Sequence, residues 1–246
     1  MSTVVQEAPA RPIRVLLVDD DPMVVRGLQL MLEAGSDGEI SVVGTAGDGT
    51  EVVQAVRAHY PDVVLMDVRM PRKDGIAATR EIVALPDAPA VVVLTTFDGE
   101  DEPIRAAHAG AAGFLLKTEA PEDIVAAVRA VAAGEGAVSQ RTARQLLHHI
   151  ADAPGAADQR RAGRLVAALS PREAQVASAV ARGLTNREIA SELYVSEGTV
   201  KAQLATVQDK LGVDNRVLVA VLLTQAGKGD TSSPSGRGVT VTHGHP

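Results

Sequence analysis

The stretch Val63–Gly75, VVLMDVRMPRKDG, joins four apolar residues to a carboxylate, Asp67, and then to a Met-Pro pair and a glycine turn. An apolar run that is continuous rather than alternating is typical of a strand buried on both faces of a parallel sheet. An acidic residue at the end of such a run is unexpected unless the strand leads to a site. The stretch therefore predicts a buried strand that places Asp67 at the edge of a sheet.

Four further apolar runs surround this strand in the sequence, and helix-like segments separate all five. Strand–helix alternation repeated in this way predicts an α/β doubly wound fold with a five-stranded parallel sheet. The predicted strands are 13–18, 40–44, 62–66, 90–95 and 113–116. The predicted helices are 22–35, 50–59, 75–85, 100–110 and 121–134.

Polar residues follow the predicted strands where each one ends. Asp19, Asp20 and Asp21 follow the first strand, Asp67 the third, Thr95 and Thr96 the fourth, and Lys117 the fifth. Ligands of open parallel sheets bind beyond the carboxyl ends of the strands. A single acid after a strand is more often a helix cap, and we interpret Asp21 and Asp74 in that way. Polar residues at four strand ends of one sheet instead favour a functional site.

The residue types at this edge fit one chemistry. Crowded carboxylates repel one another, and a hard cation such as Mg²⁺, which prefers oxygen ligands, relieves that repulsion. A carboxylate can also act as a nucleophile that forms an aspartyl-phosphate. A nearby ammonium and a hydroxyl could then hold the phosphoryl oxygens.

The segments VLLVDDDP, VVLMDVRMPRKDG, VVVLTTF and AGAAGFLLK together resemble the receiver domain of two-component response regulators. The resemblance covers residues 13–133. It implies that Asp67 accepts a phosphoryl group from a sensor histidine kinase. It also implies a Mg²⁺ site and a switch around the phosphoryl group. The Mg²⁺ ligands would be Asp19, Asp20, Asp67 and the backbone carbonyl of Arg69, and the phosphoryl-contacting and switch residues would be Thr95, Lys117 and Phe114.

The pattern changes after Gly134. We interpret 134–165 as a linker with one possible helix near 140–151. From Leu169 the apolar period is helical, and Ser170–Glu173 and Thr185–Glu188 read as capping boxes. Four short helices are predicted, at about 171–182, 186–193, 197–211 and 214–225. The Gly/Ser/Thr-rich tail, 227–246, is predicted to be disordered.

The third of these helices carries an apolar stripe of Val200, Leu204, Val207 and Leu211 at helical spacing. Its other face has small and polar side chains that could lie in a DNA major groove. From charge alone, a plain helical bundle is the better interpretation, because the net charge of residues 160–225 is only +3 (9 basic and 6 acidic residues).

The motif overrides that interpretation. LSPREAQVASAVARGLTNREIASELYVSEGTVKAQLATVQDKLGV resembles the LuxR-type helix-turn-helix, and with the receiver it is similar to the NarL/FixJ type of response regulator. We expect a receiver at 11–133, a linker at 134–165 and a DNA-binding domain at 166–226. Gln203 stands where relatives commonly have histidine, and Thr206 where a basic or amide residue is frequent. The expected DNA-contacting residues are Arg187, Ser196, Thr199, Lys201, Ala202, Ala205 and Gln208.

Composition narrows the remaining classes. The chain has no cysteine, which excludes disulfides and thiolate metal sites, and aromatic residues are only 2%. No apolar run reaches the length of a membrane span, so we expect a cytoplasmic protein without membrane contact. Residues 11–133 are acidic, with 11 basic and 20 acidic side chains, in contrast to residues 160–225.

The resemblance implies a transcriptional regulator rather than an enzyme, with double-stranded DNA as partner and a homodimer in the phosphorylated state. Two alternatives remain open at this point. One is a Mg²⁺-dependent phosphohydrolase, although such enzymes usually carry a second acid where this chain has Arg69. The other is a receiver that is no longer phosphorylated, with DNA binding set by partners.

Overall fold

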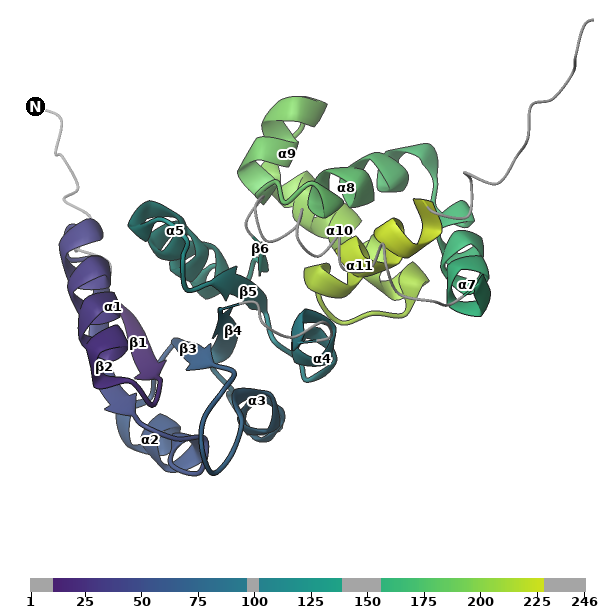
Figure 1. Cartoon of the computed structure of the whole chain (residues 1–246). Helices are drawn as coiled ribbons and strands as arrows, with labels where there is room; N and C mark the ends of the chain where they lie inside the picture. The colour runs from purple at the N-terminus through teal and green to yellow at the C-terminus, as the bar shows by residue number, and fades with distance from the viewer. Residues whose placement is uncertain (1–10, 97–101, 139–155, 228–246) are drawn as a thin grey trace, which may run out of the picture.

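A computed structural model describes residues 11–96, 102–138 and 156–227 (Figure 1). Its first part is a parallel sheet in the order β2-β1-β3-β4-β5-β6. The strands are β1 (Ile13–Val18), β2 (Ile40–Ala46), β3 (Val63–Asp67), β4 (Ala90–Thr95), β5 (Gly113–Leu116) and β6 (Ala137–Val138).

Helices cover both faces of this sheet. Because side chains alternate along a strand, Val15 and Leu17 of β1 point to one face and Leu16 and Val18 to the other. The first face packs against α1 (Pro22–Gly35) and α5 (Pro121–Ala132). The second packs against α2 (Val52–His59), α3 (Gly75–Val83) and α4 (Glu102–His108). Burial on both faces explains why the strands read as continuous apolar runs.

The predicted five-stranded parallel sheet is confirmed, and so are two predicted helix caps. Asp21 and Asp74 cap α1 and α3, because their Oδ1 atoms accept the amides of Met23 at 2.8 Å and Ala77 at 2.6 Å. The sixth strand was not predicted, because a strand of two residues carries no readable period.

The second part is helical and consists of α7 (Ala156–Ala167), α8 (Pro171–Ala181), α9 (Asn186–Leu193), α10 (Glu197–Leu211) and α11 (Arg216–Gly227). Both predicted capping boxes are present, at Ser170 and at Thr185. The predicted stripe of α10 is buried in a core shared with α8, α9 and α11. The four predicted helices are therefore confirmed.

One segment differs from the expectation. Residues 156–165, predicted as the end of a linker, belong to α7, and Ala162 of that helix is fully buried. The helix is rich in alanine and arginine and has few large apolar side chains, so its packing beside α11 was not predicted from the sequence. The possible helix at 140–151 lies outside the described residues, as does the predicted tail apart from Gly227, which ends α11.

The turn after β3 explains why residue 75 is a glycine. A Cβ on Gly75 would lie 1.9 Å from the carbonyl oxygen of Asp67 and 2.8 Å from Met66 Cγ. The amide of Gly75 donates to the carbonyl of Val68 at 2.9 Å, which folds the chain back onto the strand end. The glycine therefore lets α3 begin directly beneath Asp67.

We expect Gly75→Ala to destabilise the chain, because the new methyl group overlaps backbone that cannot move without shifting Asp67. Overpacking of this kind costs about 1–3 kcal/mol. Urea unfolding measures the effect. Gly27→Ala is the matched control, since nothing lies within 4 Å of a Cβ there and the helix α1 gains roughly 0.5–1 kcal/mol. Equal free energies of unfolding for the two variants would contradict this account of the turn.

Candidate phosphorylation site and DNA-binding surface

The acidic site forms at the carboxyl edge of the sheet. Since β1, β3, β4 and β5 are neighbours and parallel, the residues that end them lie at the same edge. Asp19, Asp20 and Asp67 each bring a carboxylate oxygen within 4.8 Å of the others. Asp19 and Asp67 are 3% and 4% exposed, whereas Asp20 is exposed. The predicted clustering of these three acids is therefore present in the fold.

Lys117, from the end of β5, joins the two buried acids. Its Nζ lies 2.6 Å from Asp19 Oδ2 and 2.9 Å from Asp67 Oδ1. Burial raises the pKa of Asp67, as does the charge of Asp19, and the Lys117 ammonium works against this rise. Burial also opposes the charge of Lys117, but its two carboxylate partners outweigh burial and raise the pKa of the ammonium. The site is a buried charge cluster with more acid than base.

The donor set suits a hard divalent cation. All three acids offer oxygen ligands, and Mg²⁺ keeps several waters when one or two carboxylates hold it. Asp19 Oδ2 is buried and, among the described residues, makes no hydrogen bond beyond its ion contact with Lys117. The exposed side chain of Asp20 leaves the cluster open to solvent on one side. The arrangement is consistent with a metal site.

Thr95 and Phe114, the other two predicted switch residues, lie on β4 and β5. Thr95 ends β4 and is buried, and its hydroxyl donates to Glu102 Oε2 at 2.8 Å. Phe114 is buried on the face of the sheet that α4 covers, near Val93 and Ala106. The Thr95 side chain therefore contacts α4 through Glu102, and the Phe114 side chain lies in the core that α4 covers.

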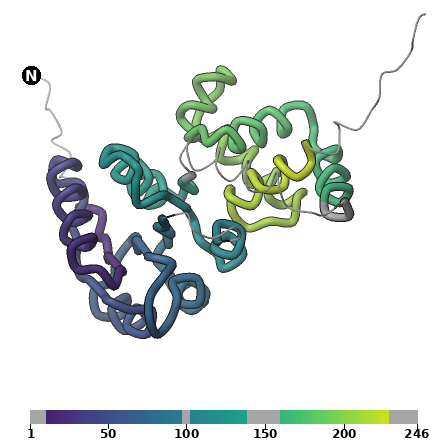
Figure 2. Tube along the Cα trace, in the orientation of Figure 1, coloured from purple at the N-terminus to yellow at the C-terminus, as the bar shows by residue number. Residues whose placement is uncertain are grey.

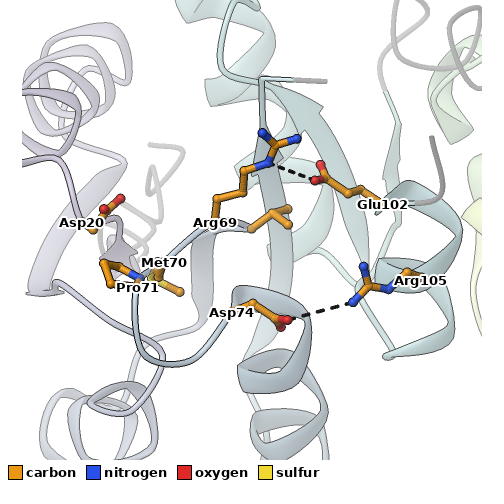
Figure 3. A pocket seen from close by; sticks show the side chains of 8 residues that line it. Asp20, Arg69, Met70, Pro71, Asp74, Glu102 and Arg105 are labelled. Carbon is orange, nitrogen blue, oxygen red and sulfur yellow. Dashed lines mark hydrogen bonds and ion pairs between the residues drawn. The ribbon is translucent and has the colours of Figure 1, made fainter. Parts of the chain in front are cut away.

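A pocket next to the acids is lined by residues from the loop after β1, the loop after β3 and the helix α4 (Figure 3). Arg69 Nε donates to Glu102 Oε1 at 3.1 Å, and Arg105 lies 3.9 Å from Asp74. Asp20 lies on the opposite side of this pocket, as Figure 3 shows. Glu102 and Arg105 were not singled out from the sequence, because no strand end or motif marks them.

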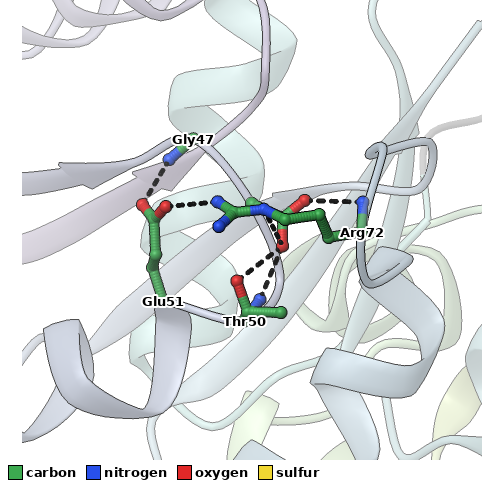
Figure 4. Close-up of polar contacts among 5 residues, drawn as sticks. Gly47, Thr50, Glu51 and Arg72 are labelled. Atoms are coloured by element: carbon green, nitrogen blue, oxygen red, sulfur yellow. Dashed lines mark hydrogen bonds and ion pairs between the residues drawn. The ribbon is translucent and has the colours of Figure 1, made fainter.

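A further missed residue is Asp48, in the loop before α2, whose partners Thr50 and Arg72 are labelled in Figure 4. Its carboxylate is 2% exposed and accepts the amide and hydroxyl of Thr50 and the backbone amide of Arg72. The Arg72 side chain reaches both Asp48 and Glu51. These contacts tie the loop after β2 to the loop after β3, the loop that contains Arg69.

The charge of Asp48 is stabilised where it lies. Burial opposes that charge, but the hydrogen bonds from Thr50 and Arg72 and the Arg72 guanidinium hold the pKa of Asp48 well below its usual range. The backbone of the same loop packs closely against the loop after β3, because a Cβ on Gly49 would lie 2.5 Å from the carbonyl oxygen of Lys73.

The second site is the exposed face around α9 and α10. Arg187, Ser196, Thr199, Lys201, Ala202 and Ala205 are exposed, and Gln208 is half-buried. The Ser196 hydroxyl caps α10 by accepting the amide of Thr199 at 3.1 Å. Gln203 is half-buried, and its Oε1 atom is enclosed without a hydrogen-bond donor among the described residues. Thr206 donates its hydroxyl to the carbonyl of Ala202 in the preceding turn.

The helical part lies against the first part of the chain (Figure 2), where α11 packs against α4 and β6. Val217, Leu218 and Val221 of α11 are buried against Ala107 of α4, with Ile104 beside them. Asn215 Nδ2 donates to the carbonyl of Ala107 at 3.0 Å. The contact combines apolar packing with a hydrogen bond between the two parts.

Two cations complete this junction. Lys201 of α10 pairs with Glu135 at 3.2 Å and donates to the carbonyl of Ala133. The buried Arg216 donates to the carbonyl oxygens of Gly136 and Leu184, one on each side of the junction. Burial lowers the pKa of Arg216 to about 10 against the opposing charges of Glu135 and Glu188. Lys201, an expected DNA contact, is therefore engaged by the receiver in this arrangement.

Two family models match this chain. The response regulator receiver domain matches residues 15–129, and the bacterial regulatory proteins of the luxR family match residues 167–223. No helix among the described residues has the length and apolar character needed to cross a membrane.

The chain is also similar to whole proteins of this kind. It is 37% identical to the transcriptional regulatory protein LiaR of Bacillus subtilis, over 85% of this chain and 95% of the relative. It is 34% identical to the DNA-binding transcriptional activator DevR/DosR of Mycobacterium tuberculosis, over 92% and 99%. Among solved structures, the response regulator ChrA of a heme-sensing two-component system is 35% identical, with a TM-score of 0.51 over 88% of this chain and 98% of that one.

We expect Asp48→Asn to lower the stability of the chain at neutral pH. Because the pKa of Asp48 is depressed in the folded state, its contribution is complete above its ordinary value of 3.8 and is lost as pH falls toward the folded pKa. The difference in free energy of unfolding between wild type and variant should therefore be largest above that value and shrink on acidification.

Urea unfolding at a series of pH values measures this difference. The control is Asp87→Asn, which makes the same change at an exposed position. A gap for Asp48→Asn that stays constant with pH, or one that matches the control, would contradict the role of the charge.

Proposed function

We propose a function for this chain from one premise: it belongs to the two-component response regulators of the NarL/FixJ type, which join a receiver domain to a LuxR-type DNA-binding domain. It is thus a transcriptional regulator and not an enzyme. The proposal is that phosphorylation of Asp67 by a sensor histidine kinase controls its binding to double-stranded DNA. The observation that carries it is the cluster of Asp67, Asp19 and Lys117 at the strand ends.

Phosphoryl transfer requires a carboxylate oxygen that can reach a donor. An Asp67 oxygen forms a bond to phosphorus while the bond between phosphorus and the donor histidine nitrogen breaks. Lys117 already touches Asp67, and its ammonium is placed to pair with a phosphoryl oxygen instead. The result is an aspartyl-phosphate that adds about −1.5 to −2 charge to the cluster.

The cation in this proposal is Mg²⁺, held by Asp19, Asp20, Asp67 and the carbonyl of Arg69. When bound, it neutralises charge on the acids and on the phosphoryl oxygens. The chain contributes the placement of the ligands. Asp48 supports it by holding the amide of Arg72, three residues after Arg69 in the same loop.

The switch residues in this proposal are Thr95, Lys117 and Phe114. Thr95 turns its hydroxyl toward the phosphoryl group, and the packing around Phe114 rearranges with it. Thr95 is bonded to Glu102 of α4, and Phe114 packs in the core beneath α4. A change at either residue therefore reaches α4, the helix against which α11 packs. The chemistry at the sheet edge is thus linked to the DNA-binding domain.

The DNA-binding surface comprises α10, which enters a major groove, and the N-terminal part of α9. Ser196 and Thr199 at the start of α10 bring hydroxyls and a helix N-terminus toward phosphate. The residues that contact DNA are Arg187, Ser196, Thr199, Lys201, Ala202, Ala205 and Gln208.

The docked arrangement is the unphosphorylated state in this proposal. Lys201 is paired with Glu135, so it reaches DNA only after the junction opens. Phosphorylation favours the open state and a homodimer, whose two recognition helices meet half-sites about one helical turn apart. The units proposed from the sequence are the receiver at 11–133 and the DNA-binding domain at 166–226, and α7 joins the second of these, so the linker of 134–165 ends before Ala156. We propose that the protein acts in the cytoplasm, where the DNA lies.

The residue at position 69 disfavours the alternative of a phosphohydrolase. The second acid that such a reaction needs would stand at position 69, where Arg69 directs its side chain to Glu102. A phosphoryl group on Asp67 would therefore serve as a signal and not as a step in turnover.

The test is the intact mass of wild type and Asp67→Asn after treatment with acetyl phosphate and Mg²⁺. We expect a phosphoryl-sized gain in wild type alone, because the amide cannot take a phosphoryl group. Binding to DNA upstream of the chain's own gene should tighten several-fold in the treated wild type and remain unchanged in the variant.

Asp87→Asn controls for the substitution itself and should behave like wild type. An equal mass gain in Asp67→Asn would place the acceptor elsewhere. A gain in wild type that leaves DNA binding unchanged would contradict control by phosphorylation.

A further inference from the structure

Glu102 holds the two groups that border the phosphorylation site. It is the first residue of α4 and is 8% exposed. One carboxylate oxygen, Oε2, accepts the hydroxyl of Thr95 at 2.8 Å. The other, Oε1, accepts Nε of Arg69 at 3.1 Å, as Figure 3 shows. A single buried acid thus joins the end of β4 to the loop after β3.

The bond to Thr95 competes with the proposed switch. A threonine hydroxyl has one proton, so it can donate only one hydrogen bond at a time. While Thr95 donates to Glu102, it cannot donate to a phosphoryl oxygen on Asp67. The bond between Thr95 and Glu102 must therefore break before Thr95 can contact the phosphoryl group.

The negative charge of Glu102 also disfavours the phosphorylated arrangement. A phosphoryl group brings more negative charge to an edge that already holds Asp19, Asp20 and Asp67. Glu102 adds a further carboxylate at the rim, and like charges disfavour one another, most strongly where burial limits screening. When Thr95 leaves, Glu102 also loses a hydrogen-bond donor while it remains nearly buried, which is unfavourable.

We propose that Glu102 is a positioning residue that retains the hydroxyl of Thr95 in the unphosphorylated arrangement and thereby restrains activation. This rests on the proposed function, because it assumes that Asp67 is the acceptor and that Thr95 moves toward it. Glu102 sets how strongly a phosphoryl group must bind before the switch completes.

A purely structural role for Glu102 predicts the opposite result. If the acid only braced α4 against the loop after β3, its loss would loosen the site and weaken binding of a phosphoryl group. If it retains Thr95, its loss frees the hydroxyl and strengthens that binding. The sign of the change separates the two roles.

The experiment uses the full chain and beryllofluoride, which binds a carboxylate as a mimic of the phosphoryl group. Its apparent dissociation constant is measured with saturating Mg²⁺ for wild type, Glu102→Ala and Glu102→Gln. We expect roughly five- to tenfold tighter binding in Glu102→Ala, the size of one net hydrogen bond. Glu102→Gln should lie between this variant and wild type, because its amide oxygen still accepts one hydrogen bond without the charge.

Glu122→Gln is the matched control, an exposed acid in the first turn of α5, and should bind beryllofluoride like wild type. Beryllofluoride affinity equal to or weaker than wild type in both Glu102 variants overturns the proposal. If Glu102→Ala does not fold, the Gln variant decides alone by the same criterion.

If Asp67 is not the phospho-acceptor, the beryllofluoride measurements give a different result. In that case wild type itself does not bind beryllofluoride, or Asp67→Asn binds it equally well. The Asp67→Asn measurement is therefore made first, and the Glu102 variants are interpreted only where binding depends on Asp67.

Discussion

One ammonium between two buried carboxylates is the interaction on which the rest of the site depends. Lys117 contacts both Asp19 and Asp67, and these three residues come from the ends of β5, β1 and β3. Buried charges persist only when they are paired or bind a metal, so the cluster needs the sheet order that brings these ends together. With more acid than base, it favours a cation, and its one ammonium can also pair with an incoming phosphoryl group.

A short helix connects this cluster to the DNA-binding domain. The helix α4 has seven residues, which corresponds to about 10 Å of length. Glu102, at its start, holds Thr95, and Ala107, near its end, packs against α11 and accepts a hydrogen bond from Asn215. A shift of so short a helix at one end would move its other end, which gives the proposed coupling between phosphorylation and the release of Lys201 from Glu135 a physical basis.

Much of the fold could be predicted from the sequence, because buried parallel strands read as continuous apolar runs and helix caps follow local rules. Asp19, Asp67 and Lys117 could be found for the same reason: each stands where a readable strand ends. Glu102 and Asp48 could not. Each has one partner that is far away in sequence, since Asp48 accepts the amide of Arg72 and Glu102 accepts the side chain of Arg69, and no local pattern encodes such a pair. The helix α7 escaped prediction because its burial depends on α11.

The distance between the receiver and the DNA-binding domain is the measurement that tests this account most directly. The chain has no cysteine, so spin labels can be placed at Arg26→Cys on α1 and Ser191→Cys on α9, both exposed positions. The account predicts a narrow distance distribution without a phosphoryl mimic and a shifted, broader one with beryllofluoride and Mg²⁺. The shift should be absent in Asp67→Asn. An unchanged distribution in a protein that binds beryllofluoride through Asp67 would contradict the coupling of the acidic site to the domain junction.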